Sequence, residues 1–407
     1  MTSTEVRELC TVVRGSSPRP KGDPRYYGGN VPRLMVSDVS RDGMYVTPRT
    51  DSLTEEGARK SRPMKTGDIV IAVSGDPGEP SILTIDACIH DGFVGLRELK
   101  DDLVYPPYFY RYFKFFKNFS QSQAVGAIYK NLTTDQIKQL KIPLPPLDEQ
   151  KRIASILDAA DAYRQKTKAL LTKYDELTQS LFLEMFGDPV ANNKGLRETQ
   201  LGELTEKITT GSTPKGGKEN YVKSGIPFIR CQNVWRGYFN MNDVAHITEA
   251  MHSSLMKSSL KHGDILMTKT GRLSTVNSSL GRSAMYLGKN DNANISTDVF
   301  LIRLKENVSK WYVSYILSSD LYNSYLRGSS VGGTDKRHLY KEHLEKLKII
   351  LPPLDLQNQF TAHIQAIESQ KSQTRQSLTK AEELFNSLQQ RAFKGELTSQ
   401  ELGSLVS

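Results

Sequence analysis

The sequence has little cysteine and no long apolar run. Its 407 residues include only three cysteines, Cys10, Cys88 and Cys231, and no Cys-x-x-Cys pair, so a zinc knuckle, a thioredoxin-like motif and a disulfide framework are not expected. No apolar run approaches the ~20 residues needed to cross a bilayer, and residues 1–5 contain no apolar signal core. We therefore expect a soluble, cytoplasmic protein with no membrane partner.

Motifs that carry out catalysis are also missing. An amino-methyltransferase needs an Asp/Asn-Pro-Pro-aromatic loop, and the nearest string, Tyr105-Pro106-Pro107-Tyr108, lacks the leading acceptor. The stretch 211–218 resembles a phosphate-binding loop, but Gly217 stands where that loop requires a lysine. The histidines show no metal-ligand spacing. We therefore expect no active site, no metal site and no cofactor bound by this chain.

The sequence does have an excess of positive charge. Lys and Arg number 54 against 45 Asp and Glu, which gives a net charge of +9. Such a surplus suits a polyanionic partner, because each phosphate that a protein neutralises releases a counterion. Many basic proteins bind no nucleic acid, so the charge by itself only makes DNA or RNA a candidate partner.

The chain contains an internal repeat. Residues 141–150, KIPLPPLDEQ, recur as residues 348–357, KIILPPLDLQ, with eight of ten positions identical at an offset of 207. Looser matches in the same order precede this block, with 15–18 matching 211–214 and 67–70 matching 263–266. Repeats of this kind define the architecture. Each half is predicted to be one variable globular unit followed by one nearly invariant helical unit.

A long helix is predicted after each repeated block. The Pro-Pro pairs of the blocks impose extended chain, and Asp148 and Asp355 then stand as candidate N-caps. Neither stretch contains proline or glycine before Gly187 and Gly395. Each helix should therefore have about 37–40 residues and a length of about 55–60 Å.

Apolar residues in both helices alternate at spacings of four and three, which is typical of a coiled coil. Two like halves related by a two-fold axis must run their helices antiparallel, with Thr167 and Thr374 near the middle of the pair. The alternative is two separate amphipathic helices, each packed on its own globular unit. The predicted seam of the helix pair contains Ile153, Leu157, Thr167, Leu171, Leu181, Phe360, Ile364, Thr374, Leu378 and Leu388.

The globular units have short apolar runs between turn signals. Residues 68–73, 226–231 and 264–268 are predicted strands. The aromatic stretches 108–119 and 311–325 are predicted helices, for which core packing is favoured over a nucleic-acid stacking surface. We therefore expect an α/β fold with mostly antiparallel or mixed sheets. The predicted domains are 1–145 and 191–350, which are two similar α/β units, and 146–190 and 351–407, which are the helices that separate them.

This layout resembles the specificity subunits of type I restriction–modification systems. The resemblance covers essentially the whole chain and depends on the doubled blocks Leu144–Leu147 and Leu351–Leu354, each opening a long helix, together with the paired Gly-Asp-Ile strands. It implies that the variable units are target recognition domains and the helices are conserved spacers. One departure is that only a few residues precede the first domain, where some relatives carry a further helical piece.

The resemblance also implies a function and partners. The chain would be a non-catalytic subunit that binds a bipartite, gapped target in double-stranded DNA, with helix length setting the gap. Two methylase subunits would be its partners, and two nuclease/translocase subunits would join them for cleavage. S-adenosylmethionine would be bound by the methylase partner.

Stretches that match between the halves but differ in chemistry are the predicted DNA contacts. Arg272 suits guanine, Lys269 suits phosphate, and glutamine or asparagine suits adenine; the alternative for each residue is a solvated loop charge. The predicted contacts in the first half are Arg19, Lys21, Arg25, Tyr26, Arg33, Ser37, Ser74, Gly75, Tyr129 and Lys130. Those in the second half are Lys215, Lys218, Tyr221, Arg230, Gln232, Asn233, Lys269, Thr270, Gly271, Arg272, Lys336 and Arg337.

Two other functions are compatible with this pattern. One is a self-sufficient DNA methyltransferase or nuclease, for which turnover by the purified chain with S-adenosylmethionine and DNA would be diagnostic. The other is a coiled-coil scaffold with two protein-binding heads. Salt-dependent, sequence-dependent DNA binding that the methylase partner strengthens would exclude the scaffold.

Overall fold

The computed structural model describes residues 3–122, 133–213, 216–275 and 277–396, and the chain divides into two compact units. Unit 1 consists of Met1–Ala169 and Arg375–Ser407, and unit 2 consists of Leu170–Thr374. Each unit combines a globular α/β part with one half of each long helix. This division cuts across the four domain ranges expected from the sequence, which stay a prediction.

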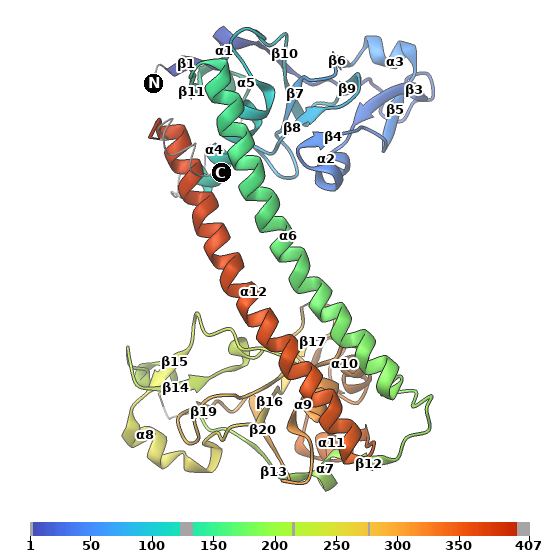
Figure 1. Cartoon of the computed structure of the whole chain (residues 1–407). Coiled ribbons are helices and arrows are strands. Elements are labelled where there is room, and N and C mark those ends of the chain that lie inside the picture. The colour runs from blue at the N-terminus through green and yellow to red at the C-terminus, as the bar shows by residue number, and fades with distance from the viewer. Residues whose placement is uncertain (1–2, 123–132, 214–215, 276, 397–407) are drawn as a thin grey trace. The chain divides into compact units, whose positions relative to one another are not determined.

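The two long helices are α6 (Leu147–Phe186) and α12 (Leu354–Lys394), with 40 and 41 residues (Figure 1). Their predicted lengths are therefore confirmed. Each helix ends before a glycine in the left-handed region, with φ of 74° at Gly187 and 78° at Gly395. The N-cap prediction is wrong, because both helices begin one residue earlier and Asp148 and Asp355 lie inside the first turn. There their carboxylates still face the positive end of the helix dipole.

Burial along α6 and α12 follows the four-three spacing, and all ten predicted seam residues are buried or partly buried. Ile153, Leu157 and Leu388 belong to the core of unit 1, whereas Phe360 and Ile364 belong to the core of unit 2. Each long helix therefore packs on the globular part of both units. The periodicity is confirmed, and the pairing of the helices as a coiled coil stays a prediction.

The two seam threonines are also buried, at 8% exposure each. The Thr167 hydroxyl donates to the Tyr163 carbonyl and the Thr374 hydroxyl to the Gln370 carbonyl, both at 2.8 Å. Each hydroxyl is thus satisfied within its own helix, four residues back.

Unit 1 contains two main sheets. The first has the order β2-β10-β7-β8-β4, formed by Thr11–Arg14, Phe93–Arg97, Ile69–Ala72, Pro80–Leu83 and Tyr45–Val46. The second has the order β5-β3-β9-β6, formed by Asp51–Leu53, Tyr27–Leu34, Ala87–Ile89 and Arg62–Met64. Strands β4–β8 and β3–β9 pair in parallel and the other neighbours are antiparallel, so the predicted mixed sheet is confirmed. Strand β7 is the strand predicted over 68–73.

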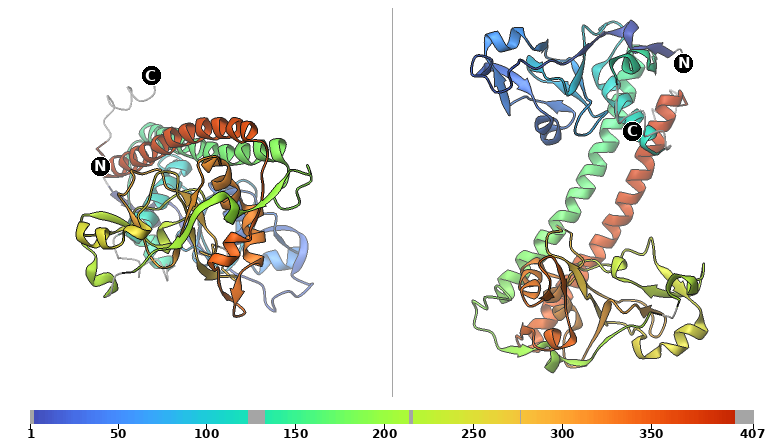
Figure 2. Two further views of the ribbon diagram at one scale, coloured as in Figure 1. Left: turned by 90° about the horizontal axis from the view of Figure 1, so that it is seen from below. Right: turned by 180° about the vertical axis from the view of Figure 1, so that it is seen from behind.

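Short helices and a two-stranded sheet complete unit 1. The helices are α1 (Val6–Leu9), α2 (Val36–Asp42), α3 (Glu55–Arg59), α4 (Pro106–Ser122) and α5 (Thr134–Gln139). Strand β1 (Ser3–Glu5) pairs antiparallel with β11 (Lys141–Pro143). The sheet that contains β3 lies with α3 on one side of the unit, and α4 and α5 lie on the other (Figures 1 and 2).

Unit 2 repeats this plan with smaller sheets. The first has the order β13-β20-β16-β18, formed by Thr205–Thr210, Val299–Leu304, Ile265–Thr268 and Ser283–Met285. The second has the order β15-β14-β19, formed by Ala245–Ile247, Ile226–Ile229 and Asn294–Ile295. Two further sheets are β17-β22-β21, formed by Thr270–Arg272, Lys336–His338 and Val331–Gly332, and β12-β23, formed by Glu198–Gln200 and Lys348–Ile350.

The helices of unit 2 are short. The α-helices are α7 (Leu201–Leu204), α8 (Glu249–Ser254), α9 (Lys310–Ser318), α10 (Asp320–Gly328) and α11 (Lys341–Glu345). Three 3₁₀ turns are η2 (Gly217–Asn220), η3 (Cys231–Asn233) and η4 (Met256–Ser258). Among the described residues of the whole chain, no helix combines the length and the apolar character that crossing a membrane requires.

The aromatic helices are part of the cores, as predicted. In α4, Tyr108 is fully buried and its hydroxyl donates to the Pro143 carbonyl at 2.7 Å. In unit 2, Tyr312 is likewise buried and donates to the Ile350 carbonyl at 2.9 Å. The single helix expected over 311–325 is instead two, because Ser319 ends α9 and caps α10.

The repeated blocks have the same structural role in both units. The side chain of Gln150 accepts from the Tyr105 backbone N–H at 2.9 Å and donates to the carbonyls of Leu103 and Pro145 at 2.7 and 2.8 Å. Gln357 donates to the Pro352 carbonyl at 2.8 Å and accepts from the Ser309 backbone N–H at 3.4 Å. Both glutamines are buried. The blocks are therefore alike because they fix the start of each long helix to its globular part.

Candidate nucleic-acid interface

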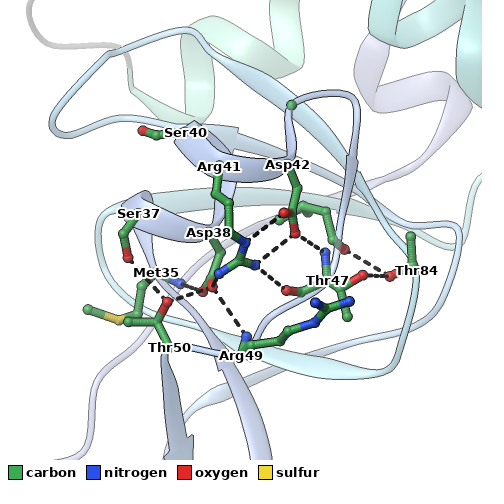
Figure 3. Close-up of polar contacts among 12 residues, drawn as sticks. Met35, Ser37, Asp38, Ser40, Arg41, Asp42, Thr47, Arg49, Thr50 and Thr84 are labelled. Atoms are coloured by element: carbon green, nitrogen blue, oxygen red, sulfur yellow. Dashed lines mark hydrogen bonds and ion pairs between the residues drawn. The ribbon is translucent and has the colours of Figure 1, made fainter. Parts of the chain in front are cut away.

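A polar turn follows the first strand of the second sheet in each unit. In unit 1 this turn is organised by Asp38, whose side chain is fully buried (Figure 3). It accepts hydrogen bonds from the backbone N–H groups of Met35 and Arg49, at 3.0 and 3.2 Å, and from the Thr50 hydroxyl at 2.6 Å. The Arg41 guanidinium lies 3.0 Å away. Burial acts to raise the pKa of Asp38, but these hydrogen bonds hold it below its ordinary value, so the group stays a carboxylate.

Asn233 holds the equivalent position in unit 2 and is only 1% exposed. Its oxygen accepts from the Arg230 backbone N–H at 2.9 Å, and its amide nitrogen donates to the carbonyls of Asn240 and Asp243 at 3.0 and 3.2 Å. The Asn233 amide group is therefore buried and used within the protein, and its contact with adenine stays a prediction.

The neighbouring position in each unit is exposed. Ser37 follows β3 and its hydroxyl lies 3.3 Å from the Thr50 hydroxyl, whereas Gln232 donates to the Asp243 carboxylate at 2.9 Å. Serine and glutamine at one position of a common scaffold present different hydrogen-bonding groups. Both residues remain candidate DNA contacts.

Two more predicted contacts are buried in unit 1. Arg33 is 5% exposed, and its guanidinium donates to Asp51 at 2.6 Å and to the Ser17 hydroxyl at 2.9 Å. Tyr26 is also 5% exposed and lies beneath the ammonium of Lys60, which is 4.0 Å from the ring centroid. Both side chains are therefore engaged within unit 1, and their contact with DNA stays a prediction.

The remaining described candidates of unit 1 are exposed, namely Arg19, Lys21, Arg25, Ser74 and Gly75. Arg25 is ion-paired to Asp23 at 2.7 Å, and this hydrogen-bonded arginine lowers the pKa of Asp23. Arg19 lies 3.9 Å from Asp91, which is a weak pairing. Predicted contacts Tyr129 and Lys130, as well as Lys215 of unit 2, lie outside the described residues.

In unit 2 the structure brings two predicted stretches together. Gly271 pairs with Arg337, and Arg272 pairs with Lys336, across the antiparallel strands β17 and β22. Arg272 is 71% exposed at its side chain, with its Nε 3.8 Å from Asp335. Lys336 is exposed, and Lys269, Thr270 and Arg337 are partly buried. These strands thus present several cations on one small sheet.

Gly271, one of the predicted DNA contacts, has a packing role in unit 2. A Cβ atom placed at this residue would lie 2.3 Å from the backbone nitrogen of Leu280. The close approach of these two backbone segments excludes a larger residue, so the glycine is explained within unit 2.

The candidates of the second sheet of unit 2 form another group. Arg230 is partly buried, with its guanidinium 5.5 Å from the Tyr221 ring centroid and 3.2 Å from the Asp243 carboxylate. Lys218, in η2, is exposed. In this group Lys218 is the candidate whose charge is most open to solvent.

The sequence did not reveal one group of side chains near Asn233. Trp235, Arg236 and Tyr238 lie in the turn that follows η3, and Trp235 packs against Arg282. The available signal was the Trp-Arg-Gly-Tyr string at 235–238, two residues after Asn233. Within the described ranges, no group of three or more histidine, cysteine, aspartate or glutamate side chains is placed to hold a metal ion.

Comparison with known proteins identifies the family. The Type I restriction modification DNA specificity domain matches residues 1–178 and 193–383. The EcoKI specificity subunit of Escherichia coli (strain K12) is 23% identical over 430 residues, covering 97% of this chain and 89% of the relative. The StySPI specificity subunit of Salmonella potsdam is 23% identical over 421 residues with the same coverage.

A solved structure has a similar fold. The S subunit of a type I restriction–modification system from M. genitalium superposes with a TM-score of 0.56 at 14% identity and covers 96% of both chains. The resemblance noted in the sequence is thus confirmed. The chain belongs to the type I restriction modification DNA specificity domain family and is a specificity subunit, which serves in DNA target recognition.

Proposed function

We propose that this specificity subunit recognises a bipartite, gapped target in double-stranded DNA, with one half-site for each unit. One observation carries the proposal. The two units share the same arrangement of strands and turns, but the exposed residues at equivalent positions differ. Ser37 and Gln232 differ in this way, although the buried residues beside them, Asp38 and Asn233, have the same structural role. Different hydrogen-bonding groups select different bases in the major groove, so the two half-sites should differ.

The long helices are the proposed spacer between the half-sites, packed as an antiparallel coiled coil. Two observations support this proposal. The first half of α6 and the last half of α12 contribute to the core of unit 1, and the other halves contribute to the core of unit 2. The four-three burial pattern continues through both helices. A helix of 40 residues is about 60 Å long, and this length would set the gap.

The proposed partners are double-stranded DNA, two methylase subunits and, for cleavage, nuclease/translocase subunits. S-adenosylmethionine is assigned to the methylase partner, and no cofactor is assigned to this chain. The relatives named above are specificity subunits of type I restriction enzymes, and this supports the assignment.

A map of methylated adenine in the host genome tests the proposal. We expect one gapped, asymmetric motif that disappears when the gene is deleted. A contiguous motif, or a motif that survives the deletion, would contradict the proposal.

Binding assays then test the spacer. The chain assembled with its methylase subunits should bind the mapped target, and insertion of one base pair in the gap should weaken binding. Equal affinity for all gap lengths would rule out a fixed spacer. The purified chain alone, given S-adenosylmethionine and DNA, serves as the control and should transfer no methyl group.

A further inference from the structure

A tight turn at residues 235–238 of unit 2 carries aromatic and cationic side chains. The Trp235 backbone N–H donates to the Tyr238 carbonyl at 3.0 Å, and Gly237 supplies a left-handed φ of 76°. The Gly237 N–H also donates to the Ser283 carbonyl at 2.8 Å. The turn is therefore fixed to the edge strand β18, with the Tyr238 side chain 50% exposed.

Arg282 lies against this turn without an acidic partner. Its guanidinium carbon is 3.9 Å from the centroid of the Trp235 ring, and that ring stacks on the Tyr238 ring with centroids 6.1 Å apart and an interplanar angle of 14°. Among the described residues, no carboxylate lies within ion-pair distance of Arg282, although it is only 8% exposed. Burial lowers the pKa of Arg282. The positive charge is thus held by an aromatic face and backbone carbonyls.

Helix α10 connects the turn to the strand that carries Arg272. The Arg236 guanidinium pairs with Asp320 and donates to the Asn323 oxygen at 3.0 Å. One turn further along α10, Arg327 donates to the carbonyls of Arg272 and Leu273, at 3.4 and 3.1 Å. Burial, and then the charges of Arg327 and Arg282, lower the pKa of Arg236. The guanidinium groups of Arg236, Arg282 and Arg327 are thus close enough to repel one another. An anionic ligand bound beside them would relieve this repulsion.

We propose that this cation–aromatic surface, defined as Trp235, Arg236, Tyr238, Arg282 and Arg327, binds the phosphate backbone of DNA beside the bases that Arg272 contacts. The inference rests on the proposed function and extends it to residues outside the predicted contacts. Arg236 and Tyr238 are the contacting residues because they are exposed. Trp235 and Arg282 are positioning residues that keep the turn in place, and Asp320 competes with phosphate for Arg236.

The equivalent turn of unit 1 has no such surface. It follows Asp38 and contacts β8, where the Ser81 hydroxyl donates to the Gly43 carbonyl at 2.7 Å. Its arginine, Arg41, is bonded to both Asp38 and Asp42, and this arginine lowers the pKa of Asp42 to about 2 (Figure 3). Arg41 thus has two carboxylate partners, whereas Arg236 is paired with Asp320 alone, so the phosphate contact is assigned to unit 2.

Two substitutions with opposite expected effects test the proposal. Arg236→Ala is made in the chain assembled with its methylase subunits and should weaken binding to target and non-target DNA alike by about tenfold. The slope of log K against the logarithm of the salt concentration should become smaller in magnitude by about 0.9. Asp320→Asn should tighten binding several-fold because it frees Arg236, and a folding defect cannot produce that gain. Lys289→Ala is the matched control, since it removes one exposed charge at the other end of β18 and should change nothing.

A fluorescence measurement tests the positioning residues. The chain has two tryptophans, so Trp311→Phe leaves Trp235 as the single reporter. Target DNA should change its emission intensity, and Arg282→Gln should alter that emission before DNA is added.

The inference is overturned if Arg236→Ala and Asp320→Asn both bind as the Lys289→Ala control does, or if DNA leaves the Trp235 emission unchanged. In those cases the proposed function survives so long as the wild-type complex still selects its gapped target. If the wild-type complex shows no sequence-dependent binding at all, the proposed function fails and this inference fails with it.

Discussion

Asp38 and Asn233 make the same backbone contact in the two units: each side-chain oxygen accepts a hydrogen bond from the N–H three residues earlier, on Met35 at 3.0 Å and on Arg230 at 2.9 Å. Both contacts close the short helical turn that follows a strand of the second sheet. One side chain is a carboxylate and the other an amide, so the position requires an acceptor and not a charge. This explains why an asparagine with the chemistry of an adenine contact is in fact buried.

Replacement of Asp38 should therefore depend on whether an acceptor remains. Asp38→Ala should destabilise the chain by about 3 kcal/mol, because donors on Met35, Arg49 and Thr50 lose the fully buried acceptor that they share. Asp38→Asn introduces the residue type that unit 2 has at the equivalent position. It should lower the free energy of unfolding by less than half as much as Asp38→Ala does. Urea unfolding of the full chain measures both, and equal losses for the two variants would contradict the shared role.

The two block glutamines offer a matched comparison. Gln150→Ala should destabilise by about 2–3 kcal/mol because three hydrogen bonds at 2.7–2.9 Å are lost in a fully buried place. Gln357→Ala should cost about 1–2 kcal/mol, since only its bond to Pro352 is short. Thermal unfolding of both variants tests which substitution is the more destabilising. A larger loss of stability for Gln357→Ala would show that these hydrogen bonds do not set the stability of the helix starts.

Arg272→Ala should relax the choice of base in one half-site. Its side chain is exposed and only weakly paired to Asp335, so it is free to form a bidentate contact with guanine worth about 1–3 kcal/mol of discrimination. Competition binding with DNA altered in either half-site measures the effect. Arg33→Ala is the informative control, because a buried arginine should affect stability and leave base preference alone. Equal relaxation in both half-sites would refute the assignment of Arg272.

Acidification should destabilise unit 1 through His90. Burial, and then the nearby charge of Arg33, lower the pKa of His90 below its ordinary value of about 6.5. The unfolded chain therefore takes up a proton at higher pH than the folded chain does. The contribution of neutral His90 to the free energy of unfolding is therefore complete above about pH 6.5. It is lost as the pH falls through the lower pKa that His90 has in the folded state.

His90→Gln should reduce this dependence. The free energy of unfolding, measured at pH 7.5 and pH 5.5, should fall less in the variant than in the wild type, while the other six histidines supply the same background in both. An identical fall in the two proteins would show that His90 does not titrate in this way.

The large features of the fold followed from periodicity in the sequence. The repeat, the two long helices and the strands at 68–73 and 264–268 could all be predicted, because apolar spacing and proline or glycine stops act locally. Pairing between distant segments could not be predicted. Arg272 and Lys336 were both candidates, but only the structure shows them as neighbours across β17 and β22.

The burial of polar and charged candidates was the other feature that the sequence did not reveal. Arg33 has the residue type of a DNA contact, and its partner Asp51 is 18 residues away in the chain. The pairing of β3 with β5 places Arg33 opposite Asp51, and the Arg33 side chain is buried there. The cation–aromatic turn was missed for the opposite reason, since Trp235 and Arg282 become neighbours only when β18 forms. Residue type thus identified candidates, and tertiary structure shows which of the described ones are exposed.

Gln150 and Gln357 lie inside the repeated blocks and bond to backbone groups, those of the block prolines Pro145 and Pro352 and those of the globular parts. Because these partners are backbone groups, a different globular part with the same backbone geometry would keep the attachment. A crossover within 141–150 and 348–357 would join a foreign head to an intact helix start. Under the proposed function, a hybrid carrying two copies of the same head would recognise a palindrome in place of an asymmetric site, and recombination at these two blocks would change which DNA the host marks as its own.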